Sequence, residues 1–164
     1  MRFSSIAHFL QQFLRICIPL FAILLGYWYQ PKESTMASRP ALSNLNVFSK
    51  PLAHFSNKPM TGFYRDGYCR TGPEDFGNHA VAGVVTDEFL RFSASRGNDL
   101  RSIPGMEGGC KWCLCTSRWK EALDAYRKGQ IGEVAVPKVF LHATDRSALD
   151  RLGLEDLKKF AADE

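Results

Sequence analysis

The sequence predicts a small α+β domain, a two-layer sandwich in which three or more short strands form one sheet against about three helices. Three apolar strand-like segments occur along the chain, and each is followed by a segment with helical periodicity. A content of 45% hydrophobic and 23% charged residues is ordinary for a folded protein. The roughly 120 residues from Leu45 onward can bury a core without disulfides. Strand order and direction cannot be read from the sequence.

The first strand is expected at residues 79–85, because HAVAGVV is short, apolar and ends in β-branched valines. Thr86 follows and is suited to cap a helix, since its hydroxyl can accept a hydrogen bond from the first turn. Asp87 and Glu88 occupy that turn, where the helix dipole favours acidic side chains. Gly97 is expected to end the helix.

A second strand is predicted at residues 111–115. Thr116 or Ser117 is expected to cap the helix that follows, and Gly129 to end it. The apolar positions of this helix recur with helical spacing, at Trp119, Ala122, Leu123 and Tyr126. The pattern predicts an amphipathic helix with one buried face.

The third strand is predicted at residues 136–142. Pro137 weakens its start, which is typical of an edge strand or of a strand beginning. The last helix is expected at residues 154–162. Its apolar face is formed by Leu154, Leu157, Phe160 and Ala161.

Residues 1–35 form a hydrophobic leader. Its uncharged run at residues 16–29 is 14 residues long, which is closer to the apolar part of a secretory signal than to a membrane span of about 20 residues. Three interpretations stay open. The leader is a cleaved secretory or organellar signal, or a retained membrane anchor through residues 13–29, or a non-native extension in front of Met36.

Residues 36–45 are predicted to be a linker, and residues 46–162 the single globular domain. The localisation follows from the leader. A native leader implies secretory or organellar targeting or membrane attachment, and a non-native one implies a cytoplasmic protein. Contact with a membrane is expected only through residues 13–29, if that segment is retained.

The charge distribution argues against nucleic-acid binding. Of the net charge of +4, residues 1–42 carry +3, from four basic and one acidic side chain. The remaining 17 basic and 16 acidic residues leave the body of the chain nearly neutral. Phosphate backbones require clustered positive charge, and no long Lys/Arg run follows residue 42.

A family resemblance is carried by five motifs, which are TGFYRDGYCRTGPED (61–75), NHAVAGVVTDEFL (78–90), SRGNDL (95–100), WCLCTSRW (112–119) and LEDLKKFA (154–161). With these motifs the chain resembles, from about residue 46 to residue 161, the family catalogued as domain of unknown function 2237. The resemblance implies a small α+β fold with no established activity. Members often carry cysteine where this chain has Ala82 and sometimes where it has Phe55, and an acid is usual where it has Cys110.

Cys113 and Cys115 should share one face of their strand, about 6.6 Å apart at Cα, with Trp112 and Leu114 packing on the other side. A direct disulfide between the two is disfavoured at that separation. The two thiols could instead be small buried hydrophobes, or zinc ligands. Cys110 and Cys113 also form a C-x-x-C, which is a redox pair only if Cys110 lies in a turn before a helix.

The loop at residues 61–77 has a glycine every five residues, so its backbone can turn and approach another group closely. It also carries arginines and acids suited to a small polar or anionic ligand. An open alternative is a loop held rigid by internal Arg–carboxylate pairs. The predicted ligand-binding residues are Arg65, Asp66, Cys69, Arg70, Glu74, Asp75, Arg96, Asn98, Asp99, Cys113, Cys115 and Arg118.

Three functions therefore stay open for this domain. The favoured one is a binding domain for a small molecule, which requires Cys69 to lie beside Cys115. The second is a thiol-dependent or redox enzyme in which Cys69 or Cys115 is the nucleophile, activated by an arginine or by His79. His79 itself fits a hydrogen-bonded framework residue better than a base. The third is a structural zinc site using Cys69, His79, Cys113 and Cys115. Which cofactor the domain uses, if any, is left open by the sequence.

Overall fold

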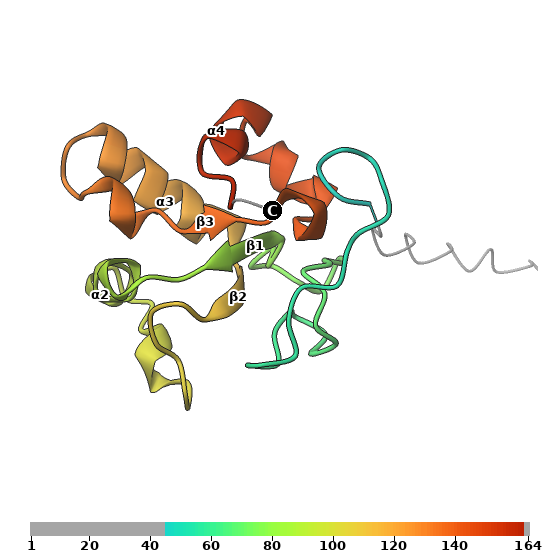
Figure 1. The fold of residues 1–164 in the computed structure, drawn as a ribbon, viewed down its shortest axis with the longest axis horizontal. Helices are drawn as coiled ribbons and strands as arrows, with labels where there is room; N and C mark the ends of the chain where they lie inside the picture. The colour runs from blue at the N-terminus through green and yellow to red at the C-terminus, as the bar shows by residue number, and fades with distance from the viewer. Residues whose placement is uncertain (1–44, 163–164) are drawn as a thin grey trace, which may run out of the picture. The chain divides into compact units, whose positions relative to one another are not determined.

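A computed structural model describes residues 45–162. Three short strands form one antiparallel sheet in the order β2-β1-β3, with β1 (Val81–Val84) between β2 (Lys111–Leu114) and β3 (Lys138–Val139) (Figure 1). Within it Ala82 pairs with Cys113, and Gly83 pairs with both Trp112 and Val139. The fold is a small α+β fold, as the sequence predicts.

Three α-helices accompany the sheet: α2 (Asp87–Ser95), α3 (Thr116–Arg127) and α4 (Leu154–Lys159). Figure 1 shows α2 at one end of the sheet and the blue-green segment of residues 45–79 at the other. Four short 3-10 turns connect these elements, at Leu100–Ser102, Glu133–Ala135, Leu141–Ala143 and Arg146–Asp150.

Helix α2 begins and ends as predicted. The Thr86 hydroxyl accepts a hydrogen bond from Phe89 N at 3.0 Å, which satisfies a donor of the first turn. Asp87 and Glu88 lie in that turn. Gly97 follows the last turn with a φ of +80°, a left-handed conformation that glycine adopts at little cost.

The predicted start of α3 is wrong by one residue. Cys115 is the N-cap residue, and its side chain makes no capping hydrogen bond. The Thr116 hydroxyl points back to the preceding loop and donates to Asn78 O at 3.0 Å. The predicted apolar face is buried at Trp119, Ala122 and Leu123. The hydroxyl expected to cap the helix therefore connects it to the loop instead.

The third strand is shorter than the predicted span of residues 136–142. Pro137 has no N–H for a ladder, and after Val139 the Thr144 side chain takes part in the pairing, since its hydroxyl accepts from Ala82 N at 3.1 Å. The last helix also ends earlier than predicted. Beyond it Ala162 N bonds Val139 O at 2.9 Å, so the C-terminal segment pairs with β3.

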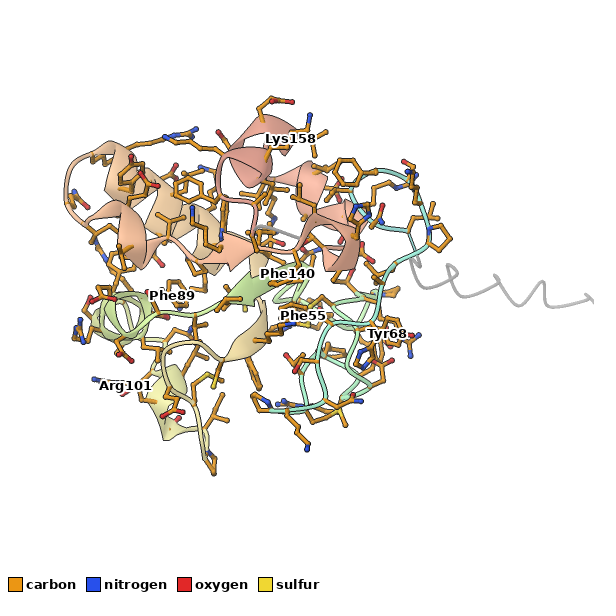
Figure 2. The ribbon with its side chains drawn as sticks, in the orientation of Figure 1. Phe55, Tyr68, Phe89, Arg101, Phe140 and Lys158 are labelled. Atoms are coloured by element: carbon orange, nitrogen blue, oxygen red, sulfur yellow. A yellow bond between two sulfur atoms is a disulfide. The ribbon has the colours of Figure 1, made fainter. Side chains whose placement is uncertain are left out.

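The two faces of the sheet are covered differently. Trp112 and Leu114 pack into the main core with Trp119 and Phe160 of the helical layer. Cys113, between them in sequence, faces a second cluster with residues of the loop. There Phe55 packs on Phe140 with ring centroids 5.5 Å apart (Figure 2), and the remaining members are Cys69, Ala82 and Ala143. The predicted alternation is confirmed for Trp112, Cys113 and Leu114, whereas Cys115, predicted to share the face of Cys113, lies beyond the end of β2 as the N-cap of α3.

The predicted leader, residues 1–35, and all of the predicted linker except Leu45 lie outside the described residues. Within residues 45–162, none of the helices has the length and apolar character needed to cross a membrane.

Candidate functional site

A buried carboxylate fixes the ring of His79. The side chain of Asp75 is fully buried, and its Oδ1 accepts a hydrogen bond from His79 Nδ1 at 2.6 Å. Asp75 Oδ2 accepts from the backbone N–H of His79 at 2.7 Å. Because one carboxylate holds both the ring and the backbone, the imidazole has a defined orientation. Its second nitrogen, Nε2, is then the one left to exchange a proton with another group.

The His79 ring is also packed on its surroundings. Phe63 stacks on it with centroids 6.1 Å apart and an angle of 22° between the planes. A Cβ atom at Gly77 would lie 2.5 Å from His79 Cε1, so only glycine allows this close approach. The loop is shaped around the imidazole.

Cys115 lies near His79 because the end of β2 pairs with the start of β1, where Leu114 is the partner of Val81. Cys115 is a free, half-buried thiol at the N-cap of α3. The residue after it, Thr116, donates its backbone N–H to Asn78 O at 2.9 Å, and its hydroxyl also contacts the Asn78 side chain. Asn78 immediately precedes His79. These bonds hold the thiol and the imidazole together through their neighbours in the chain.

The electrostatics of His79 reflect this contact. Its pKa is raised to about 9, first by the hydrogen-bonding interaction of the ring with the Cys115 side chain, while partial burial acts in the opposite direction. The negative charge of Cys115 and the bond to Asp75 raise the pKa further. The ring is therefore charged at neutral pH, which places a positive charge beside the Cys115 side chain.

The resulting order of groups is carboxylate, imidazole and thiol. Asp75 orients His79, and His79 can take up and return a proton of Cys115, which is the arrangement that activates a nucleophile. The thiol also lies at the start of a 12-residue helix, where the partial positive charge of the dipole favours an anion. The arrangement places an oriented imidazole and a helix N-terminus beside a free thiol.

The other two cysteines of the predicted site are joined. Cys69 and Cys113 form a disulfide with a Cα–Cα distance of 5.2 Å, and both residues are buried. Cys69 therefore lies beside the strand end that carries Cys115, as a shared site requires. As half of a disulfide it is not a free nucleophile, and that prediction is wrong for this structure. The Cys110–Cys113 redox pair is also excluded here, because Cys113 is bonded elsewhere and Cys110 is free.

A zinc site is not supported. The hypothesis uses Cys69, His79, Cys113 and Cys115, but two of these sulfurs are bonded to each other and are not available as thiolate ligands. Within residues 45–162, no group of three or more His, Cys, Asp or Glu side chains could hold a metal ion.

The charged residues of the loop contact one another. Arg70 Nε donates to Asp66 Oδ2 at 2.7 Å, and the guanidinium lies 4.8 Å from the ring centroid of Tyr64. The Tyr64 hydroxyl donates to Glu74 at 3.0 Å. Arg65 donates to the backbone of residue 60 and lies over the Trp112 ring. The Arg70–Asp66 pair fits the alternative in which internal Arg–carboxylate contacts hold the loop.

The remaining predicted ligand residues lie near α2 and α3. Asn98 bonds Ser93 at the end of α2, and Asp99 pairs with Arg101 at 2.8 Å. Arg118 donates to the backbone carbonyl of Arg96 at 3.1 Å. The structure thus brings Asp75, His79 and Cys115 together, and places these residues in separate surface contacts.

A family model described as "Uncharacterized protein conserved in bacteria (DUF2237)" matches residues 45–161, which include every strand and helix of the described fold. The chain belongs to this family. No curated protein matches it. The matched residues of this chain include Asp75, His79 and Cys115.

One signal in the sequence could have assigned His79 a larger role. Asp75 and His79 are four residues apart on either side of a glycine, a spacing that lets a short turn bring carboxylate and imidazole together. The partner thiol lies 36 residues further along the chain, and only the pairing of β1 with β2 brings it near.

Proposed function

We propose that this domain is a thiol-dependent enzyme in which Cys115 is the nucleophile, His79 the general acid and base, and Asp75 the group that orients His79. The observation that carries the proposal is the connected order of buried carboxylate, fixed imidazole and half-exposed thiol. Packing alone does not require a carboxylate to hold a histidine against a free thiol at a helix N-terminus.

Acyl transfer to water is the reaction class that suits these groups. Cys115 Sγ attacks the carbonyl carbon of an ester or thioester, a C–S bond forms, and the bond to the leaving group breaks while His79 gives that group a proton. A water molecule then gives a proton to His79 and adds to the acyl carbon. The C–S bond breaks, the acid departs, and the Cys115 thiolate is restored.

The small-molecule site favoured by the sequence fits this proposal as the place where the substrate binds. Its loop arginines are already engaged with carboxylates, carbonyls and rings, which gives the loop a supporting role around His79. A binding domain without chemistry accounts less well for the interaction between His79 and Cys115.

The first experiment measures alkylation of the full chain by iodoacetamide at pH 7 without reductant, with each cysteine followed by peptide mapping. Cys115 should react at least about tenfold faster than N-acetylcysteine, because the positive charge of His79 lies beside the attacking sulfur. His79→Gln should remove most of that advantage. The matched control is Cys110→Ala, which deletes the other free thiol and should leave the rate unchanged.

The second experiment tests the reaction class with p-nitrophenyl acetate. Acid quenching during turnover should trap an acetyl group on Cys115, and Cys115→Ala should release no p-nitrophenol above background. The proposal fails if Cys115 alkylates no faster than the model thiol. If it alkylates fast but is never acylated, acyl transfer is the wrong reaction class.

A further inference from the structure

Exposed apolar side chains gather on the loop that carries His79. The exposed large hydrophobic residues of the described chain are Met60, Phe63, Phe76 and Val134. Three of these four lie within residues 60–76, the part of the loop that leads to the imidazole. A single exposed hydrophobic residue is ordinary, but several on one functional loop indicate a surface that binds an apolar group.

Phe63 covers one face of the His79 ring. The two ring centroids lie 6.1 Å apart, with 22° between the planes. Hydrogen bonds to an imidazole are made at its ring nitrogens, so Asp75 and Cys115 meet His79 at the edge of the ring while Phe63 lies over its face. Phe63 is itself 39% exposed. A molecule that reacts at Cys115 is therefore within reach of an exposed aromatic ring.

Phe76 lies in the turn that builds the proposed site. It follows Asp75, which holds the His79 ring, and precedes Gly77, where a Cβ atom would lie 2.5 Å from His79 Cε1. The Phe76 residue is 94% exposed, so the fold gains almost nothing from packing it. Its ring has a large apolar area that another molecule can cover.

The charged side chains of the same loop already have partners. Arg70 pairs with Asp66, and its guanidinium lies over the Tyr64 ring. Arg65 donates to a backbone carbonyl and lies over the Trp112 ring. Because both arginines of residues 60–76 are engaged within the domain, the surface that this loop offers beside His79 is mainly apolar.

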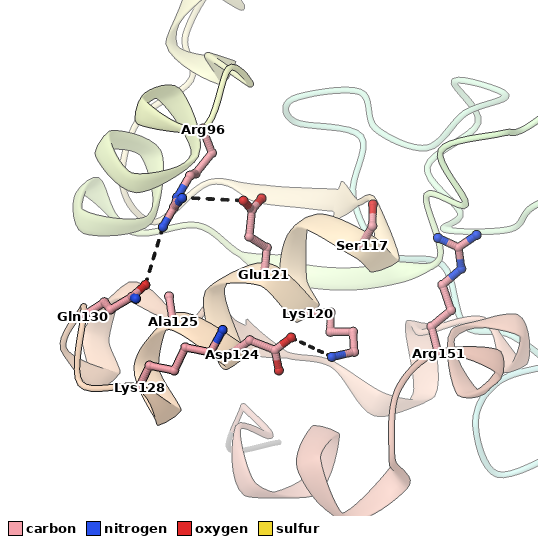
Figure 3. Close-up of a pocket in the computed structure, with 9 residues that line it drawn as sticks. All are labelled: Arg96, Ser117, Lys120, Glu121, Asp124, Ala125, Lys128, Gln130 and Arg151. Atoms are coloured by element: carbon pink, nitrogen blue, oxygen red, sulfur yellow. Dashed lines mark hydrogen bonds and ion pairs between the residues drawn. The ribbon is translucent and has the colours of Figure 1, made fainter.

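A groove of about 570 Å³ along the exposed face of α3 is separate from this loop (Figure 3). Its lining extends from Ser117 and Arg151 to Gln130, and it includes neither Cys115 nor His79. A second groove, of about 580 Å³ beside α2, also lacks both residues. Because no reacting group lines either groove, the loop surface is better placed to hold a substrate.

We propose that Phe63 and Phe76 bind the apolar acyl group of the ester or thioester that reacts with Cys115, and so select an uncharged, hydrophobic acyl chain over acetyl. This inference rests on the function proposed above and adds the chemical class of its substrate. The reaction is the acyl transfer to water already described and needs no further reactant.

The substrate test compares p-nitrophenyl hexanoate with p-nitrophenyl acetate, which share a leaving group and differ in the length of the acyl chain. The full-length protein should prefer the hexanoate at least about tenfold in kcat/KM, because each methylene group that is buried favours the longer chain. Phe63→Ala and Phe76→Ala should each lower this preference severalfold. Phe76 has almost no packing to lose, so its substitution tests binding without unfolding the domain.

The matched control is Val134→Ala, which removes an exposed hydrophobic side chain outside the loop and should leave the preference unchanged. A second test uses iodoacetamide and N-benzyliodoacetamide, which alkylate Cys115 without acyl transfer. The benzyl reagent should be favoured severalfold at Cys115 relative to N-acetylcysteine, and less so in Phe76→Ala.

The two tests separate this inference from the proposed enzyme. If neither ester acylates Cys115 but the preference for the benzyl reagent is present, acyl transfer is overturned and the apolar site stands. If the benzyl reagent has no advantage at Cys115, or if the hexanoate preference is unchanged by both substitutions, the apolar site alone is overturned.

Discussion

Two regions of this domain are built in different ways. The sheet-helix region, residues 80–162, contains all the strands and α-helices of the described chain and most of the main apolar core. The loop region, residues 45–79, has only turns and isolated bridges. The loop region is held in place by single side-chain contacts instead of by a strand ladder. The Asn46 side chain bonds four backbone groups, and the Cys69–Cys113 disulfide joins the loop to the sheet.

The difference matters because the proposed site draws on both regions. Asp75 and His79 belong to the loop region, and Cys115 starts a helix of the sheet-helix region. A hydrogen-bonded ladder spreads the effect of a local change over many contacts, whereas a loop held at a few points depends on each of them. The geometry around His79 should therefore be most sensitive to the fastening of the loop region.

The largest expected effect comes from the disulfide. It closes a loop of 44 residues, and losing that constraint on the unfolded chain should lower the free energy of unfolding by about 4 kcal/mol. The Cys69→Ala/Cys113→Ala protein measured by urea denaturation should show this loss. Reductant should destabilise the unaltered chain and leave the double variant unaffected. A loss under about 1 kcal/mol would mean that the other contacts of the loop region suffice.

The next largest loss of stability is expected from alanine substitution at one of two glycines that have similar backbone angles. Gly62 in the loop region has a φ of +88° and Gly97 after α2 has a φ of +80°. Alanine at Gly97 meets open space, so only backbone strain of about 1 kcal/mol is expected. Alanine at Gly62 would also collide with the carbonyl of Tyr68, for a total loss of about 2–4 kcal/mol.

Thermal and urea unfolding of both alanine variants measure this difference. The same substitution at the same kind of backbone position should lower stability more in the loop region than after α2, because only the Cβ at Gly62 meets another backbone group. Equal losses at Gly62 and Gly97 would show that the loop backbone can move aside.

The smallest effect on stability concerns pH. Because the pKa of His79 is raised from 6.5 to about 9 in the folded state, its charged form stabilises the fold. This contribution is fully present below about pH 6.5 and is lost as the pH rises through about 9. The His79 side chain is 32% exposed, so solvent screening keeps the contribution small.

The NMR titration of the His79 ring proton checks the cause of the raised pKa. The midpoint should lie near pH 9 in the unaltered chain and fall towards 6.5 in Cys115→Ala, which removes the largest contribution. Cys110→Ala should leave it in place. A midpoint near 6.5 in the unaltered chain would mean that His79 and Cys115 do not interact.

Most of the fold could be predicted from local patterns. The helix after Thr86 was predictable because its cap, first-turn acids and terminal Gly97 are all local in the chain. The boundaries that failed are those where a distant group intervenes. Thr116 does not cap α3 because Asn78 accepts its hydroxyl, and the third strand stops where the Thr144 side chain pairs with β1.

The site was predictable only in part. The sequence indicated a dense polar loop and a pair of thiols, and the motifs identified the family that the match over residues 45–161 shows. It ranked His79 as a framework residue and left Cys69 and Cys115 as equal nucleophiles. Which thiol is free depends on a disulfide across 44 residues, and no local pattern determines that pairing.

The amino-acid sequence alone determined the fold class, the approximate elements and the alternation along Trp112-Cys113-Leu114, because helical and strand periodicities are properties of neighbouring residues. Only the tertiary structure decided the surroundings of Cys113 and Cys115. The antiparallel pairing of β1 with β2 buries Cys113 against the loop, while the start of α3 turns Cys115 towards His79. Contacts between residues far apart in the chain set these environments, so local sequence cannot specify them.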